Sequence, residues 1–246
     1  MRILMMASFG MEIAECGGAL AKAVRQGHEV HAAVLMSREE SRPQIAESAA
    51  RLGITAEVEF LGYQYGEVEV TGDAKVPVVS LLRRVRPDVI IMQDPEHAQH
   101  DLDPDRRMIA LLYSEAMAIA GRDWRIEECG GHEPTPIPTI YYMTPSSPNC
   151  IVEISDVIDV KLSAFESLTY QMAFSAQVLQ QRMGSHISNV LPDWDPDASD
   201  TDKGLAIVVQ SERANALYHG IAGHSGAVMG EAYRKEGAFT LDELAP

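Results

Sequence analysis

The chain has 246 residues, 46% of them hydrophobic, and carries 36 acidic against 20 basic residues, a formal charge of −16. This acidic balance argues against nucleic acid or an anionic membrane surface as a partner. No apolar run reaches the roughly 18 residues that a membrane-spanning helix needs. The three cysteines (Cys16, Cys129 and Cys150) lie far apart and favour neither a disulfide framework nor a cysteine zinc site. Because the N-terminus also lacks the shape of a signal peptide, we expect a soluble, cytoplasmic protein.

Residues 1–36 predict a strand, a loop, a helix and a second strand. The apolar run at 2–7 is too short for a helix, apolar residues then recur at helical spacing up to Gly27, and a second apolar run covers 28–36. Such a unit packs as a right-handed crossover between parallel strands. Further expected strands at 56–61 and 89–92 follow helices at 37–53 and 75–85, an alternation typical of an α/β fold with a parallel sheet.

The second half of the chain continues this alternation and then becomes helical. We expect a helix at 106–120, strands at 139–143 and 150–154, a long helix at 155–182, an acidic loop at 192–202 and a further helical region from 204. The sequence therefore predicts a single domain over residues 1–246. It is a three-layer α/β/α sandwich around a mostly parallel, Rossmann-like sheet, with a core at 1–160 and a C-terminal helical part at 161–246.

Two loops are expected at the same edge of this sheet. Ligands of open parallel sheets bind beyond the carboxyl ends of the strands. The first strand ends at a loop that contains Ser8, Phe9, Gly10, Met11 and Glu12, and the fourth strand ends at a polar loop over residues 93–107. We expect the two loops to face each other across a ligand site.

Short segments in a fixed order along nearly the whole chain resemble the PIG-L/LmbE family of zinc-dependent N-deacetylases. The segments are ASFGME at 7–12, CGG at 16–18, GHEV at 27–30, FLGY at 60–63, RPDV at 86–89, the tyrosine pair at 141–142, the run at 154–159 and EAYR at 231–234. A glycosyltransferase-like N-terminal domain would share the first strand, the glycine pair and GHEV. It does not explain the later segments, and 246 residues are short for its two domains.

The chain departs from the family where the zinc chemistry should be. In the family, the His and second Asp of A-H-P-D-D bind zinc and the first Asp is the general base; Ser8, Met11 and Gly10 stand at these positions. The third family ligand is the last His of H-P-D-H, where this chain has Arg106. Serine and methionine do not replace an imidazole and a carboxylate at a zinc site, and arginine does not ligate.

Two interpretations of this edge remain open. In the first, Arg106 supplies a fixed positive charge that, with Arg107 behind it, orients a small anionic ligand, or else fills the vacated space as an internal ion pair. Ser8, Phe9, Gly10 and Met11 would then also bind the ligand, and the candidate catalytic groups are Glu12, His100, Asp103 and Arg106. In the second, a metal site is rebuilt from relocated ligands, namely His97, His100 and Asp101, with Glu12, Glu15 and Asp103 as further candidates.

We therefore expect a divergent member of the family that binds or transforms a small molecule without the usual zinc. The alternative is a metal-dependent, amino-sugar N-deacetylase-like hydrolase with relocated ligands. No cofactor is expected, with zinc present only if the site is rebuilt. The resemblance also implies a homo-oligomer, a trimer or a hexamer, with no nucleic acid and no membrane as partner.

Overall fold

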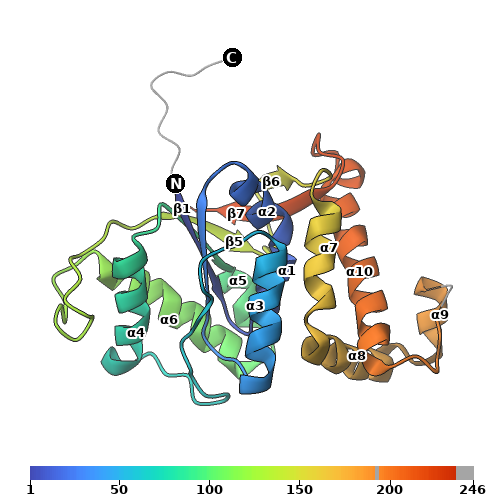
Figure 1. The fold of residues 1–246 in the computed structure, drawn as a ribbon, viewed down its shortest axis with the longest axis horizontal. Helices are drawn as coiled ribbons and strands as arrows, with labels where there is room; N and C mark the ends of the chain where they lie inside the picture. The colour runs from blue at the N-terminus through green and yellow to red at the C-terminus, as the bar shows by residue number, and fades with distance from the viewer. Residues whose placement is uncertain (192–193, 237–246) are drawn as a thin grey trace.

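A seven-stranded sheet forms the centre of the protein. The structure is a computed structural model, and it describes residues 1–191 and 194–236. The order of strands across the sheet is β3-β2-β1-β4-β5-β7-β6, and the first five run parallel (Figure 1). β7 is antiparallel to both of its neighbours. The strands are β1 (Arg2–Ala7), β2 (Glu29–Val34), β3 (Glu59–Phe60), β4 (Val89–Gln93), β5 (Thr139–Met143), β6 (Cys150–Glu153) and β7 (Gly230–Lys235).

Helices cover both faces of this sheet, so the predicted three-layer α/β/α architecture is confirmed. In Figure 1, α4 and α6 lie on one face, α1, α2, α3 and α7 lie on the other, and α8 and α10 pack beyond α7. The α-helices are α1 (Met11–Glu15), α2 (Gly17–Arg25), α3 (Arg42–Arg51), α4 (Gly72–Val85), α5 (Pro95–His100), α6 (Pro104–Ala120), α7 (Ile158–Glu166), α8 (Thr169–Met183), α9 (Ile187–Val190) and α10 (Asp200–His219). Short 3₁₀ helices are η1 (Glu39–Ser41), η2 (Gly184–His186) and η3 (Ile221–Gly223).

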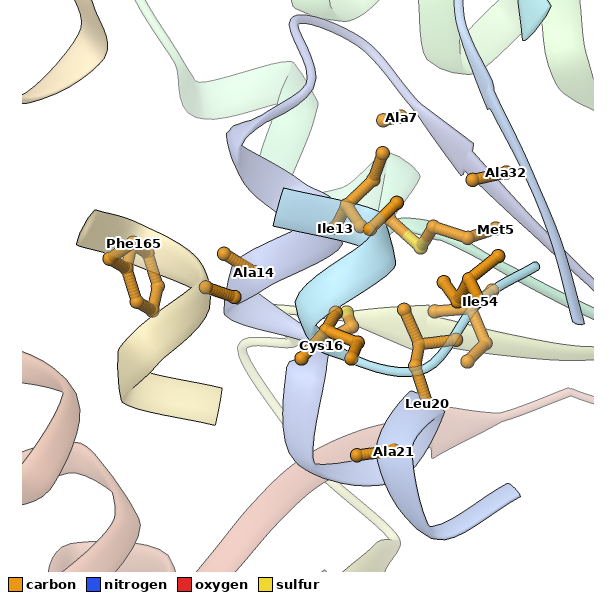
Figure 2. Close-up of a cluster of buried hydrophobic side chains, with 14 of the residues drawn as sticks. Met5, Ala7, Ile13, Ala14, Cys16, Leu20, Ala21, Ala32, Ile54 and Phe165 are labelled. Carbon is orange, nitrogen blue, oxygen red and sulfur yellow. The ribbon is translucent and has the colours of Figure 1, made fainter. Parts of the chain in front are cut away.

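The side chains on the two faces of β1 belong to two separate hydrophobic clusters. Met5 and Ala7 point to one face of the sheet and Leu4 and Met6 to the other, because successive side chains of a strand alternate. Figure 2 shows the first cluster, in which Ile13 of α1 lies between the β1 side chains and Phe165 of α7. Burial on both faces explains why β1 is apolar throughout residues 3–7.

The structure differs from the sequence prediction in four helical segments. The expected loop at 93–107 contains α5 and the start of α6, because Asp94 and Asp103 cap these helices and a proline follows each of them. The expected helix at 37–53 starts only at Arg42, after η1. The helix at 155–182 is two helices that are broken at residues 167–168, and the first helix of the chain is likewise broken, at Cys16. Part of the expected acidic loop, residues 192–193, lies outside the described residues.

The C-terminal part is not purely helical, since it also supplies β7, a strand that the sequence analysis missed. β7 pairs with β5 and β6 inside the sheet. Arg234 of β7 forms an ion pair with the fully buried Asp94 at the end of β4, at 2.8 and 2.9 Å.

Among the described helices, none combines the length and the apolar character that a membrane span requires.

Gly10 is expected to be intolerant of any side chain. Its φ angle is +98°, and a Cβ there would lie 2.5 Å from Cδ1 of Ile45. Gly10→Ala should therefore lower the free energy of unfolding by about 2–4 kcal/mol, as measured by denaturant titration. This loss is the sum of the backbone strain of a non-glycine residue at a positive φ angle and of the overpacking of its Cβ against Ile45. Gly27 has a φ of +78° and no atom within 4 Å of the point where a Cβ would lie, so Gly27→Ala tests strain alone and should lose only about 1–2 kcal/mol. Equal losses in the two variants would contradict the packing argument.

Candidate functional site

The carboxylate of Glu12 shapes the loop between β1 and α1. Glu12 is 3% exposed and accepts hydrogen bonds from the backbone N–H groups of Ser8 (3.2 Å), Phe9 (3.2 Å) and Gly10 (2.9 Å). A charged acceptor at the start of a helix satisfies donors that would otherwise be left without partners. Glu12 therefore organises this loop, and its predicted catalytic role stays a prediction.

Carboxylates also organise the segment that follows β4. Asp103 accepts from the N–H of Asp105 at the start of α6, and Asp101 accepts from the N–H of Asp103, both at 2.9 Å. Asp105 is buried and binds the N–H of Gly66 with both oxygens, at 2.8 and 3.0 Å. These bonds hold the first turn of α6 against the loop after β3.

Arg106 joins the β1 loop to the β4 loop, so the two loops face each other as the sequence predicts. Its Nη1 donates to Oε1 of Gln93 (2.9 Å) and lies 3.9 Å from Oε1 of Glu12, while its Nε lies 3.3 Å from Oδ2 of Asp101. The guanidinium also lies over the ring of Phe9, 5.0 Å from its centroid. Arg107 is exposed and donates to the carbonyl of Asp101, so it supports the loop behind Arg106.

A cleft of about 460 Å³ opens beside Arg106. Phe9 and Met11 line it, whereas Ser8 and Gly10 are buried and are not among its lining residues. Its walls are aromatic: Phe9 stacks on Tyr65 with centroids 5.9 Å apart, and Arg38 lies 5.4 Å from the ring centroid of Tyr170. The lining residues are Phe9, Met11, Glu12, Glu15, Arg38, Ser41, Tyr65, Asp103, Arg106, Tyr170, Gln171, Phe174 and Ser175.

Several polar groups of this cleft lack protein partners. Within residues 1–191 and 194–236, no carboxylate lies within ion-pair distance of Arg38, and no acceptor engages Nη2 of Arg106. Oε1 of Gln171 is buried and likewise has no hydrogen-bond partner in these ranges. The cleft therefore presents two guanidinium groups and one amide that are available to a ligand.

The residues predicted as relocated metal ligands do not come together. His97 is exposed and lines a second cleft, His100 is exposed at the end of α5, and Asp101 pairs with Arg106. The described part of the chain holds no group of three or more His, Cys, Asp and Glu side chains that is arranged to bind a metal ion.

The second cleft, of about 310 Å³, lies over a buried charge cluster. Lys161 is 2% exposed, and its Nζ contacts Glu231 (2.8 Å), Glu212 (2.8 Å) and the carbonyl of Glu15 (2.6 Å). Burial alone would lower the pKa of Lys161, but the carboxylates of Glu231 and Glu212 raise it above its ordinary value. Lys161 is therefore a charged ammonium whose three hydrogens are all engaged.

Glu15 lines both clefts and is the most perturbed carboxyl group of this region. Burial, followed by the negative charges of Glu12 and Glu212, raises the pKa of Glu15 to about 8, while Arg106 and Lys161 act in the opposite direction. In the described part of the chain, no hydrogen bond or ion pair reaches its carboxyl group. A carboxyl group with such a pKa in a cleft is a candidate for proton transfer or for ligand binding.

The sequence indicates Glu15 only as a substitute metal ligand, and Arg38, Tyr65 and Tyr170 were not predicted as residues of the cleft. Arg38 follows β2 and so lies at the carboxyl edge of the sheet, a position that the strand prediction could have identified. Tyr170 carried no such signal, because only the tertiary structure brings α8 to the cleft.

The chain is similar in sequence to one deacetylase. Over 154 residues, which make up 62% of this chain, it is 30% identical to diacetylchitobiose deacetylase of Thermococcus kodakarensis. The match spans 54% of that enzyme, about half its length. No family model matches the chain.

Solved structures share the fold over most of the chain. N,N'-diacetylchitobiose deacetylase of Pyrococcus horikoshii has a TM-score of 0.69 at 20% identity, covering 96% of this chain and 83% of the other. The conserved protein TT1542 of Thermus thermophilus (TM-score 0.71, 19% identity) and the 4-carboxy-2-hydroxymuconate hydratase GalB of Pseudomonas putida KT2440 (0.66, 18%) each cover 99% of both chains. At these identities the likeness establishes the fold alone.

The raised pKa of Glu15 predicts a loss of stability with rising pH. Between about pH 4.5 and 8 the folded protein retains a proton that the unfolded chain has lost, so its stability falls across this range and levels off above it. The side chain in Glu15→Gln cannot ionise, so this variant should melt at a higher temperature than the wild type, and the difference should grow from about pH 5 to about pH 8.5. At about pH 8.5 the variant's free energy of unfolding should exceed that of the wild type by about 1–3 kcal/mol.

The control for this measurement is Glu40→Gln, which removes an exposed carboxylate that water already solvates. Thermal melts of the wild type, Glu15→Gln and Glu40→Gln at four or five pH values would test whether the raised pKa belongs to Glu15. A difference between Glu15→Gln and the wild type that is the same at every pH would contradict the assignment.

Proposed function

We propose that this chain, which has the LmbE/PIG-L deacetylase fold, binds a small anionic molecule in the cleft at Arg106 and does so without the zinc site of that family. The observation that carries the proposal is the pair of arginines, Arg38 and Arg106, with free donor groups in a cleft walled by aromatic rings. A volume of about 460 Å³ lies within the usual range of small-molecule sites, roughly 300–1,000 Å³.

The donor groups present do not fit zinc. At the three family ligand positions stand a hydroxyl, a thioether and a guanidinium, from Ser8, Met11 and Arg106, and Gly10 stands in place of the general base. Arg106 brings a permanent positive charge to this point, held by Asp101 and Glu12. A zinc ion at the same place would be repelled by the guanidinium, whereas Nη2, which has no acceptor among the described residues, can donate a hydrogen bond to an anion.

The chemistry of the walls indicates the class of ligand. Guanidinium groups bind carboxylates through paired, charge-assisted hydrogen bonds, and the faces of Phe9, Tyr65 and Tyr170 favour a flat, unsaturated body. We therefore propose a small carboxylate with a planar portion. Gln171, whose amide both donates and accepts, would fix its orientation.

The fold alone does not decide which reaction, if any, follows binding. By their names, the archaeal neighbours are deacetylases and the Pseudomonas putida neighbour is a hydratase of a carboxylated compound, so proteins of this fold differ in their chemistry. Glu12, Asp103 and Arg106 line the cleft and stay the candidate catalytic groups, while His100 is not among its lining residues. The expected trimer or hexamer stays a prediction, as does a cytoplasmic location.

Replacement of Arg106 tests the proposal directly. Isothermal titration with isophthalate, a planar dicarboxylate, should detect binding to the wild type. Arg106→Ala should weaken that binding by at least about tenfold, because a charge-assisted hydrogen bond contributes about 1.5–3 kcal/mol. Arg106→Lys should retain part of the affinity, since it keeps the charge but loses the paired geometry.

The matched control is Arg84→Ala, which removes an equal charge from a surface pair with Glu59. It should bind isophthalate like the wild type. Circular dichroism melts of each variant separate a loss of binding from a loss of folding. If Arg106→Ala binds as tightly as Arg84→Ala, the proposed site is wrong.

Metal analysis tests the alternative of a hydrolase with relocated ligands. The tag-free protein, incubated with zinc and then desalted, should hold far less than one zinc ion per chain, because His97, His100 and Asp101 do not form a metal-binding group within the described residues. Near-stoichiometric zinc that is lost in the double variant His97→Ala/His100→Ala would instead support the alternative, and hydrolysis of N-acetyl amino sugars should then be assayed.

A further inference from the structure

Glu15 lies at the junction of the two clefts. It ends α1, one helical turn after Glu12, and lines both the cleft at Arg106 and the cleft over Lys161. This position is not one of the residues that give the chain its resemblance to the zinc deacetylases. The side chain therefore has a place in the site that the resemblance does not explain.

Within the described residues, each cation beside Glu15 pairs with another acidic side chain, while Nη2 of Arg106 stays without an acceptor. Lys161 binds Glu212, Glu231 and the main-chain carbonyl of residue 15, and Arg106 is held by Asp101 and Gln93. A charge on Glu15 would add to the nearby negative charges of Glu12 and Glu212, in partly desolvated surroundings. The carboxyl group thus retains its proton near neutral pH, which makes it a hydrogen-bond donor.

The other acidic groups of this region are satisfied within the protein. Glu12 accepts three backbone hydrogen bonds, Asp103 caps α6, and Glu231 accepts from Gly18, Ala19, Tyr233 and Lys161. No such bond reaches the carboxyl group of Glu15 from the described residues. A donor without a partner that faces two clefts is available to a bound molecule.

We propose that Glu15 is a second ligand-contacting residue of the cleft, and that its carboxyl O–H donates a hydrogen bond to an oxygen of the anion that Arg106 holds. The inference rests on the proposed anion site and narrows its ligand. The ligand carries a carboxylate at one end for Arg106 and a second acceptor oxygen, from a carbonyl or another carboxylate, at the end that meets Glu15. Oxo-acids and dicarboxylates have this pattern, and simple monocarboxylates lack it.

The proposal predicts a specific pH dependence of binding. Isophthalate is doubly ionised at both pH 7 and pH 9, so a change in its affinity reports on the protein. The protonated fraction of Glu15 falls from about nine tenths to about one tenth between these values, and the affinity of the wild type should fall about tenfold. Glu15→Gln retains a donor and cannot ionise, so its affinity should change by less than about threefold.

Other titratable groups also face Glu15 or line the two clefts. His97 and His219 are the histidines among them, and burial lowers the pKa of His219 below its ordinary value. Burial raises the pKa of Cys16 and of Tyr233 well above their usual values, and that of Tyr65 is also raised. The remaining charged groups are Glu12, Arg38, Asp103, Arg106, Lys161, Glu212 and Glu231, and Tyr170 is the last phenol.

Calorimetry of four proteins separates the possible outcomes. If Glu15→Gln shows the same fall in affinity as the wild type and as the control Glu40→Gln, the inference is wrong while the anion site stands. If the wild type binds isophthalate at neither pH, the proposed function fails and this inference fails with it. Loss of binding in Arg106→Ala together with pH-independent binding in Glu15→Gln supports both.

A carboxyl-carbon NMR titration provides a second measurement that does not depend on affinity. The Glu15 signal is identified by its absence in Glu15→Gln, and its titration midpoint is followed with and without saturating isophthalate. A hydrogen bond from the protonated group to the anion should move that midpoint upward by at least about one pH unit. An unchanged midpoint in the saturated protein would overturn the proposal.

Discussion

The buried ammonium group of Lys161 is the interaction on which the rest of this structure depends. It lies between carboxylates from α10 and β7 and the carbonyl at the end of α1, and a charge in a protein interior is tolerated only when such partners surround it. The cluster therefore fixes the C-terminal elements on the sheet, and with them one wall of each cleft. Because Lys161 is fully engaged, it leaves Glu15 among carboxylates without a partner of its own, and burial then raises the pKa of that group to about 8. The structural charge network and the proposed ligand contact are thus parts of one arrangement.

At the sheet edge, the guanidinium of Arg106 organises the proposed ligand site. It links the β1 loop to the β4 loop through Glu12, Asp101 and Gln93 and packs on Phe9. A metal ion with an open coordination position can activate water, whereas a guanidinium offers only hydrogen bonds and charge. The function that we propose is therefore the recognition of an anion.

The sequence by itself determined the layered α/β architecture, the parallel order of the early strands and the meeting of the β1 and β4 loops. These features follow from local patterns: the apolar run at 2–7, the glycines that end helices, and the rule that parallel strands present their carboxyl ends at one edge. It also drew attention to Arg106, because the resemblance to the zinc deacetylases places a metal ligand at this position of the aligned segments.

Only the tertiary structure decided which partners these residues have. β7 was missed because its pairing with β5 and β6, and the ion pair of Arg234 with Asp94, join segments more than about 75 residues apart in the sequence. The raised pKa of Glu15 comes first from burial and then from the charges of Glu12 and Glu212. The packing of α7 against α1, and of α10 against α7, produces that burial and brings Glu212 near. Burial and electrostatic fields are properties of a packed arrangement, and no local pattern of residues encodes them.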